Sequence, residues 1–319
     1  MRALVTGAAG FIGSHLVGAL LAEGHEVVGA DCFTRNYDPR RKRDNVRTHT
    51  GHPRFTFVRT DLLQDALESL TEGVDVVFHL AGQPGVRQSW AEHFAEHDGN
   101  NIATTQRLLE AAAAAGVPRF VHASSSSVYG DCPDVPADEQ RMPVPRSPYG
   151  VTKLAAEHLC RVYAENYGIT TVSLRYFTVY GPRQRPDMAM YRMVGCALTD
   201  TPFRLYGSGD QKRDFTYVTD VVAATAAAGS CDVPAGSVLN VAGGAPVRLN
   251  DVIGLVGEVT GRALRIERCT PQRGDVARTH GETRLARALL DWKPQVGLVE
   301  GLRAQIDWQS AKRPDLAAP

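Results

Sequence analysis

The sequence predicts an α/β fold with a doubly wound parallel sheet, followed by a smaller lobe of mixed structure. Apolar runs typical of buried strands alternate with helical patterns through about residue 180. A glycine-rich segment at residues 7–13 lies between the first such strand and the first helix. After Gly181 the alternation gives way to prolines, glycines and short interleaved segments. We therefore expect a first domain over residues 1–181 and a second lobe over residues 182–319, some of whose segments return to the first domain.

Short apolar runs mark the expected strands. They are residues 2–5, 26–30, 55–58, 74–80, 119–123 and 170–176. Helical periodicity follows the glycine segment from Ser14, begins again near Asn101 and recurs over residues 218–228. Because strands and helices alternate, we expect a parallel sheet that binds its ligands at the carboxyl ends of the strands.

Gly7, Gly10 and Gly13 form a Gly-x-x-Gly-x-x-Gly motif where the first strand passes into the first helix. Glycines there let the backbone approach a pyrophosphate closely, and the free N–H groups and positive dipole end of the helix hold its charge. The alternative is a tight turn that binds nothing. The position between strand and helix favours a dinucleotide site, with Phe11 and Ile12 as further contacts.

Asp31 ends the second expected strand, about as far from the glycine loop as an acid that binds the adenosine ribose. A carboxylate at this place repels a 2′-phosphate, so the sequence favours NAD over NADP as the cofactor. Arg35 and the basic run at residues 40–43 oppose this preference, because arginines near the loop are able to bind a phosphate. We interpret the basic run as a solvated loop.

Composition excludes several classes of partner. The 319 residues include 35 basic and 35 acidic side chains, and this balance argues against nucleic acid or an anionic membrane as a partner. Six cysteines without a Cys-x-x-Cys pair argue against a metal site and a disulfide framework, and favour the reducing cytoplasm. The first expected strand begins at residue 2 and no apolar run approaches transmembrane length, so we expect neither a signal peptide nor a membrane span.

Tyr149 and Lys153 stand four residues apart, so on a helix they share one face. An ammonium beside a phenol lowers the pKa of the phenol, which then exchanges a proton with an alcohol more readily. An amphipathic surface helix is the alternative for this pair. Ser125 belongs to a run of four serines, residues 124–127, that leaves the fifth expected strand. A hydroxyl there is placed to bond a sugar oxygen as it becomes a carbonyl, although a polar turn explains four serines equally well.

Together, the glycine loop, the serine run and the Tyr149–Lys153 pair make the chain resemble the extended short-chain dehydrogenase/reductase family over nearly its whole length. The resemblance implies a Rossmann-like domain with retained NAD and a nucleotide-sugar substrate. It also implies a catalytic set of Tyr149, Lys153 and Ser125, or one of the serines beside Ser125. In this set the tyrosine takes the proton of the sugar 4-hydroxyl, while the lysine lowers the pKa of that tyrosine and holds the nicotinamide ribose. Further cofactor contacts implied by the resemblance are Asp61, Leu62, Leu80, Ala81 and Tyr176, with Asn101 as a supporting residue.

Two separated segments look like those of UDP-glucuronate 4-epimerases within this family. They are residues 36–39, after the ribose-binding acid, and residues 175–189. In the second segment, Thr178 stands where UDP-galactose epimerases and UDP-glucuronate decarboxylases usually carry asparagine. Sugar-nucleotide 4,6-dehydratases carry Asp-Glu at the places of Ser126 and Ser127, and the decarboxylases carry Glu at the place of Ser127. The missing acids argue against a lyase.

A glucuronate substrate needs hydrogen-bond donors for its C6 carboxylate. The candidate donors are Ser126, Ser127, Thr178, Arg185 and Arg87. For Thr178 the alternative is packing beside the nicotinamide, and for Arg185 it is an ion pair with Asp187.

The diphosphate of the substrate also needs cations. Arg213 matches the phosphate-binding arginine of the family, and residues 272–275, which end in Asp275, resemble its second nucleotide-binding turn. Arg273 stands where a proline is usual, so this turn departs from the family pattern. Solvated surface arginines are the alternative for Arg213 and Arg273.

The sequence therefore predicts an NAD-dependent nucleotide-sugar 4-epimerase, with an NAD-binding domain over residues 1–181 and a mainly nucleotide-sugar-binding lobe over residues 182–319. The favoured reaction converts UDP-glucuronate to UDP-galacturonate through a 4-keto intermediate. The alternatives are a UDP-glucuronate decarboxylase and a 4-epimerase of UDP-glucose or UDP-N-acetylglucosamine. An idle NAD-binding regulator has no need of both Tyr149 and Lys153. The resemblance also implies a homodimer, built from the helices that start near Asn101 and Tyr149.

Overall fold

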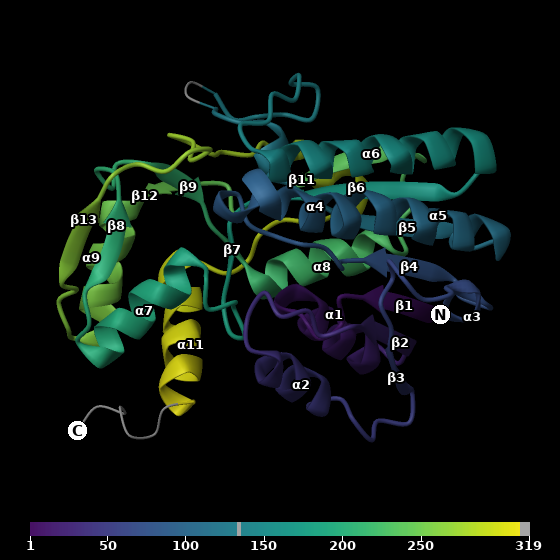
Figure 1. The fold of residues 1–319 in the computed structure, drawn as a ribbon, viewed down its shortest axis with the longest axis horizontal. Helices are drawn as coiled ribbons and strands as arrows, with labels where there is room; N and C mark the ends of the chain where they lie inside the picture. Colours follow the sequence, from purple (N-terminus) through teal and green to yellow (C-terminus); the bar gives the residue numbers. More distant parts are fainter. Residues whose placement is uncertain (133–134, 313–319) are drawn as a thin grey trace.

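A seven-stranded parallel sheet forms the centre of the larger lobe in the computed structural model, which describes residues 1–132 and 135–312 (Figure 1). In spatial order its strands are β11 (Ser237–Val241), β6 (Thr170–Tyr176), β5 (Arg119–Ser125), β4 (Val76–His79), β1 (Arg2–Thr6), β2 (Glu26–Asp31) and β3 (Phe55–Arg59). The chain order reverses between β1 and β4, and ligands bind at such a switch point, beyond the carboxyl ends of the strands. The predicted doubly wound α/β fold is confirmed.

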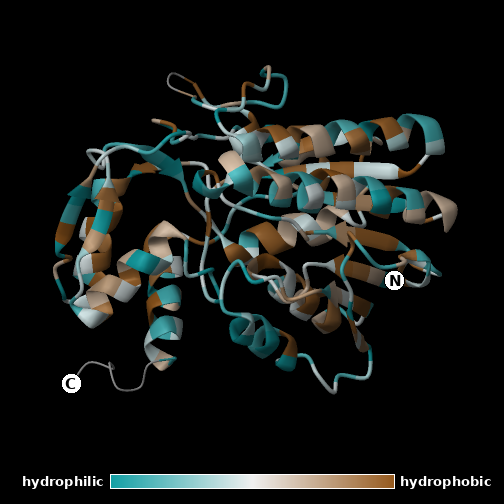
Figure 2. Cartoon of the chain, viewed as in Figure 1, coloured by the Kyte–Doolittle hydropathy of each residue, from teal (hydrophilic) through white to brown (hydrophobic). Residues whose placement is uncertain are grey.

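Helices cover both faces of this sheet. The helices α1 (Phe11–Ala22), α8 (Val218–Ala228) and α10 (Arg284–Leu290) pack in the hydrophobic core on one face. On the other face lie α3 (Glu68–Thr71), α5 (Thr104–Ala114) and α6 (Pro148–Tyr167). Ala3 and Val5 enter the first core and Leu4 enters the second, because successive strand residues point to opposite faces. Strands buried on both sides need continuous apolar runs, and Figure 2 shows this hydrophobic colour along the central strands.

The smaller lobe is built from short elements of the second half of the chain. Its strands form the parallel pair β8 (Phe203–Tyr206) with β13 (Ile266–Cys269) and the antiparallel pair β9 (Lys212–Asp214) with β12 (Pro246–Arg248). Its helices are α7 (Ala189–Thr199), α9 (Leu249–Thr260) and α11 (Leu298–Ala311). Met193, Val252 and Leu302 are fully buried where these helices meet. A further short parallel pair joins β7 (Val179–Tyr180) to β10 (Thr216–Tyr217).

The remaining described elements are short. They are α2 (Pro39–Arg47), α4 (Phe94–His97), the 3-10 turns η1 (Arg87–Ser89), η2 (Ala91–His93) and η4 (Ser126–Val128), and the π-helical turn η3 (Asp98–Ala103). Within the described residues, no helix is both long and apolar enough to cross a bilayer.

Local sequence signals set both ends of α6. The Ser147 hydroxyl accepts the Gly150 N–H at 3.2 Å, and a proline occupies the first turn. The helix ends at Gly168, whose φ of +71° is the left-handed conformation that glycine adopts without strain. This start places Tyr149 in the first turn, at the carboxyl edge of the sheet, and Lys153 one turn further on.

Two elements differ from the sequence analysis. The basic run at residues 40–43 is not a loop: it belongs to α2, which begins after Asp38 because that carboxylate caps the helix by accepting the Arg40 N–H at 2.9 Å. The sequence analysis also missed β11. This strand, with α8 and α10, comes from the second half of the chain yet packs in the larger lobe, whereas residues 313–319 of the predicted second lobe lie outside the described residues.

Candidate active site

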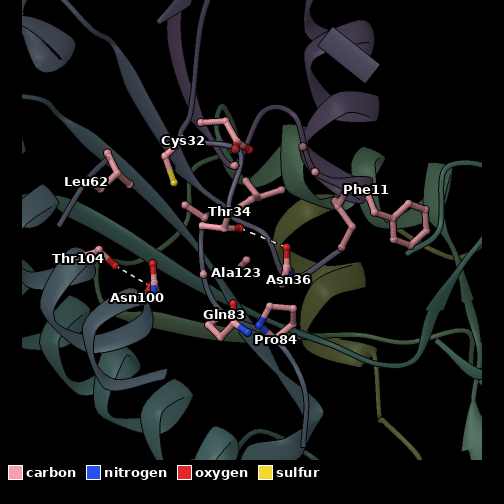
Figure 3. Close-up of a pocket in the computed structure, with 18 of the residues that line it drawn as sticks. Phe11, Cys32, Thr34, Asn36, Leu62, Gln83, Pro84, Asn100, Thr104 and Ala123 are labelled. Atoms are coloured by element: carbon pink, nitrogen blue, oxygen red, sulfur yellow. Dashed lines mark hydrogen bonds between the residues drawn. The ribbon is translucent and has the colours of Figure 1, made fainter. Parts of the chain in front are cut away.

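A pocket opens beyond the carboxyl ends of β1, β2, β4 and β5, at the switch point of the sheet (Figure 3). Every residue that the sequence suggested for cofactor contact lines it: Gly7, Gly10, Phe11, Ile12, Gly13, Asp31, Asp61, Leu62, Leu80, Ala81, Tyr149, Lys153 and Tyr176. Residues far apart in the chain meet here because parallel strands all end at the same edge.

Close backbone contacts require glycines in the loop between β1 and α1. Gly7 has a φ of +68°, and a Cβ there would lie 2.8 Å from the backbone nitrogen of Ala81. A Cβ on Gly13 would lie 2.2 Å from the carbonyl oxygen of Gly7. No side chain caps the N-terminus of α1, so its first N–H groups are available for an anion. The loop therefore fits a pyrophosphate.

The ribose end of this pocket contains a buried lysine. Asp31 accepts the N–H groups of Ala9 at 3.2 Å and Phe33 at 2.7 Å. Lys42 is only 5% exposed and donates to the Thr34 hydroxyl at 2.7 Å. Burial raises the pKa of Asp31, and the charge of Lys42 opposes that rise. Figure 3 shows Thr34 at the pocket, bonded to Asn36.

The interpretation of the basic run as solvated is therefore wrong for Lys42. This side chain lies on the inner face of α2, with Asn45 and Val46, and lines the cofactor pocket. Arg43, one residue later, is exposed. The signal that could have shown this is the helical spacing of residues 42, 45 and 46, which places them on one face. It can be recognised only if the basic run is assumed to be a helix.

Tyr149 lies where this pocket meets a second cavity, and it lines both. Burial raises the pKa of Tyr149, whereas a hydrogen bond with Ser125 and the charge of Arg185 lower it. The Lys153 ammonium is buried and donates to the carbonyl of Ala123 at 2.8 Å. Burial lowers the pKa of Lys153 to about 8.

The structure adds a backbone partner for Lys153. This residue lies one helical turn after Tyr149, as helical spacing predicts, and its ammonium donates to the carbonyl of Ala123. Desolvation dominates both groups, because the start of α6 is packed against the end of β5.

Asn101 holds the loop after β4 to α6. Its side-chain oxygen accepts the Gln83 N–H at 2.8 Å, and its amide donates to the Gln83 carbonyl at 3.0 Å and to the Thr152 hydroxyl at 2.9 Å. It lies in the π-helical turn η3, and such turns are frequent at functional sites. The supporting place predicted for Asn101 agrees with these contacts.

A buried ion pair ties α6 to the sheet directly below the site. The Glu157 carboxylate accepts the Arg175 Nε at 2.9 Å and Nη2 at 2.7 Å, and it also bonds the Ser124 hydroxyl. The Arg175 guanidinium lies 4.6 Å from the centre of the Tyr129 ring. Both charged side chains are about 5% exposed or less, so each depends on the other to offset its lost hydration.

The second cavity holds about 340 Å³ and continues from the cofactor pocket past Tyr149. It is lined by the predicted catalytic residue Ser125 and by these residues predicted to contact the substrate: Ser126, Ser127, Thr178, Arg185, Arg213 and Asp275. Burial lowers the pKa of Arg213, and the charge of Asp275 opposes this effect. Arg146 also lines the cavity, and the sequence analysis missed it because nothing near it in the chain marks a ligand.

Two of the candidate arginines are engaged in ion pairs. Arg87 does not line the cavity; its guanidinium bonds the Asp275 carboxylate at 2.7 Å and lies 4.2 Å from the centre of the Tyr206 ring. Arg185 forms a bidentate pair with Asp187, at 3.1 and 3.0 Å. That pair uses its Nε and Nη2 atoms, so the Nη1 donors lie outside it while the side chain still lines both cavities.

Comparison with known proteins identifies the family. A model of the NAD dependent epimerase/dehydratase family matches residues 3–242. The chain belongs to this family. Membership confirms two predictions from the sequence: the protein is an NAD-dependent enzyme of the nucleotide-sugar epimerase kind, and NAD is its cofactor.

Several members of the family are similar over their whole length. The chain is 42% identical over 312 residues to an uncharacterized UDP-glucose epimerase of Bacillus subtilis, covering 98% of each chain. It is 34% identical to a UDP-glucuronate 4-epimerase of Thermodesulfobacterium geofontis, covering 96% of this chain and 95% of the relative. A crystal structure of the UDP-glucuronic acid 4-epimerase from Bacillus cereus, in complex with UDP-glucuronic acid and NAD, has a TM-score of 0.95 and 42% identity. The match covers 98% of this chain and all of that one.

We expect Glu157→Gln to lower the free energy of unfolding by about 3–5 kcal/mol, because the Arg175 guanidinium is then buried without its countercharge. Urea denaturation of the purified protein at pH 7 measures this loss. The double variant Glu157→Gln, Arg175→Met removes the orphaned charge and should recover most of the stability. If the double variant loses as much as the sum of the two single variants, the pair is not coupled.

Proposed function

We propose that this enzyme is a UDP-glucuronate 4-epimerase that forms UDP-galacturonate through a 4-keto intermediate. The observation that carries the proposal is the set of donors in the second cavity: Thr178, Ser126, Ser127 and the free Nη1 donors of Arg185. These groups line the same cavity as Tyr149, which also lines the cofactor pocket. A hydroxyl-rich wall with one arginine suits a carboxylate next to the reacting carbon.

In this proposal Tyr149 takes the proton of the sugar 4-hydroxyl and later returns it. When bound, NAD would supply the acceptor for the hydride of C4 and, in its reduced form, the donor that returns the hydride to the other face of the sugar. Ser125 bonds the O4 oxygen and orients Tyr149, whose pKa it lowers by hydrogen bonding. Lys153 lies one helical turn from Tyr149, near which it places a positive charge. Its ammonium donates hydrogen bonds to the hydroxyl groups of the nicotinamide ribose.

Oxidation at C4 makes the substrate a β-keto acid, which loses carbon dioxide when its carboxylate bond aligns with the carbonyl π system. Donors that hold the carboxylate out of this alignment protect it. Ser126 and Ser127 stand where the family's lyases carry acids, and neither supplies a general acid or base. We therefore favour epimerisation over decarboxylation.

The other contacts follow from the same geometry. We propose that residues 1–181 form the NAD-binding domain, in which the loop residues Gly7 to Gly13 hold the pyrophosphate and Asp31 binds the adenosine ribose with Lys42 beside it. Residues 182–319 mainly bind the nucleotide sugar. Arg213 contacts the diphosphate, and Arg87 fixes Asp275 at the edge of the same cavity.

Proton NMR of the purified enzyme with UDP-glucuronate and no added NAD tests the proposal. UDP-galacturonate as product supports both the epimerase and its retained cofactor. A pentose or 4-keto pentose product means a decarboxylase. No reaction with UDP-glucuronate, together with turnover of UDP-glucose or UDP-N-acetylglucosamine, assigns a neutral substrate instead.

Tyr149→Phe should lower kcat by about 10²- to 10⁴-fold or more, because proton transfer at O4 loses its partner, while NAD stays bound. Tyr167→Phe is the matched control, since this tyrosine lies on the same helix and is 58% exposed. Turnover by NMR and bound NAD by absorbance of the denatured protein measure the two effects. Full activity of Tyr149→Phe contradicts the catalytic assignment.

Thr178→Asn should shift the ratio of kcat/KM values from UDP-glucuronate toward UDP-glucose. The asparagine amide is larger than the threonine hydroxyl and does not place a donor at the same position beside the substrate carboxylate. Thr178→Ser keeps the hydroxyl and should keep the preference for glucuronate. Steady-state kinetics with both substrates measures the ratio. An unchanged ratio in Thr178→Asn removes Thr178 from carboxylate recognition.

We propose a homodimer through the outer faces of α5 and α6. Val151 and Val162 of α6 are each 50% exposed and share one face of the helix, because they lie eleven residues apart, about three turns. Apolar side chains exposed together on one helix face suit an interface. Light scattering after size exclusion should give twice the chain mass of 34.6 kDa. Val162→Glu should give a single chain, and Val299→Glu on α11 is the control. A wild-type monomer contradicts the proposal.

We also propose that the enzyme works in the cytoplasm. All six cysteines are free thiols, and Cys132 and Cys160 are buried without a disulfide partner. Free thiols persist in a reducing compartment. Fractionation of cells that express the native gene locates the enzyme directly.

A further inference from the structure

A third cavity lies behind the active site. It holds about 170 Å³ between α2, the segment that follows β7, the start of α7 and the end of α11. Figure 1 shows α2 at the lower edge of the larger lobe and α11 on the side of the smaller lobe that faces it. The volume exceeds the space of one water, about 30 Å³. A small ligand fits it.

The lining of this cavity is strongly cationic. It is lined by three cations, Arg41, Arg183 and Lys312, and by one acid, Asp44. The Asp44 carboxylate forms an ion pair with Arg47 at 3.4 Å. In the described part of the chain no carboxylate lies within ion-pair distance of the three cations. Figure 2 shows α2, which contributes Arg41, as strongly hydrophilic.

Neutral groups hold these cations in place. Arg41 donates to the Tyr191 hydroxyl at 2.7 Å, and its guanidinium also lies 5.1 Å from the centre of that ring. Arg183 donates to the carbonyl of Ser14 at 3.2 Å. The Lys312 ammonium lies 5.9 Å from the centre of the Trp308 ring. These partners orient the positive groups without neutralising them, so the cavity keeps a net positive charge.

Backbone strain places one of the cations. Arg183 has a φ of +64°, a left-handed conformation that costs energy for any residue with a Cβ and is often found at ligand sites. The next residue, Gln184, is buried and fixed by hydrogen bonds to Val179 and Gln305. As a result, Arg183 enters the third cavity and Arg185, two residues later, enters the active site.

We propose that this cavity is a binding site for a small phosphate anion, held by Arg41, Arg183 and Lys312. Charge-assisted hydrogen bonds from arginine suit phosphate oxygens. The bound anion also changes the affinity of the enzyme for its substrate. This coupling acts through Tyr37, which lines both cavities, and through the short segment that joins Arg183 to Arg185.

Isothermal titration of the NAD-containing enzyme with inorganic pyrophosphate, against sodium chloride of equal ionic strength, tests the site. The enzyme is first saturated with UDP, so that the diphosphate position beside Arg213 is already filled. One anion should bind per chain. Arg41→Gln and Arg183→Gly should each weaken binding about tenfold or more, because each removes a charge-assisted contact. Glycine also relieves the strained φ, so Arg183→Gly should not lower the urea midpoint, and a loss of binding in it is not a loss of folding.

Two control variants locate the anion. Arg43→Gln removes the same charge from the exposed face of α2, and Arg213→Gln removes the cation of the substrate cavity. Both should bind pyrophosphate as the wild type does. No binding above the chloride control, or equal weakening in Arg43→Gln, means that no site exists. Loss of binding only in Arg213→Gln places the anion in the substrate cavity and overturns the proposal.

The coupling rests on the proposed function and is measured separately. Pyrophosphate competes with the diphosphate of UDP-glucuronate in every variant, so its effect on the KM in Arg41→Gln measures competition alone. The KM of the wild type and of Arg43→Gln should change by a different factor. The same change of KM in all three proteins, with binding intact, refutes the coupling and leaves the site. If UDP-glucuronate does not react at all, the proposed function fails, whereas the titration still decides whether the anion site exists.

Discussion

The active site depends on one buried carboxylate that joins three elements of the larger lobe. Glu157 of α6 holds Arg175 of β6 in a bidentate ion pair and also bonds Ser124 of β5. Glu157 lies one turn after Lys153 on α6, and Arg175 lies next to Tyr176 on β6. Lys153, Tyr176 and Ser124 itself all line the site. Their relative positions are therefore fixed from below, in a part of the protein that water does not reach.

Burying the Glu157–Arg175 ion pair costs free energy, but the dry surroundings that come with it also serve the active site. Taking two charges out of water costs more free energy than a surface ion pair gains. A buried pair of this kind therefore fixes one arrangement of the helix and the strands more than it raises the free energy of unfolding. The same dry surroundings raise the pKa of Tyr149 and lower that of Lys153. Electrostatic interactions with a reacting sugar are strong there, because little solvent screens them.

Local patterns predicted what depends on neighbouring residues. The glycine loop, the start of α6 and the buried strands follow from close contacts, capping and apolar runs within a few residues of one another. The errors fell where distant segments decide. Lys42 was taken as solvated because its helix has a buried face only when it folds against distant segments, as when Asn45 donates to the carbonyl of Ala9. The strand β11 was missed because it is completed by pairing with β6.

The sequence by itself determined the fold class and the family, and it predicted nearly half of the residues that line the cofactor pocket, because each depends on motifs with fixed local geometry. Only the tertiary structure decided how the charged side chains are used. It pairs Arg87 with Asp275, directs Lys153 to a backbone carbonyl, and sends Arg183 and Arg185 into different cavities. The physical reason is that the partners of a long charged side chain are set by which segments fold beside it, and spacing along the chain does not record them.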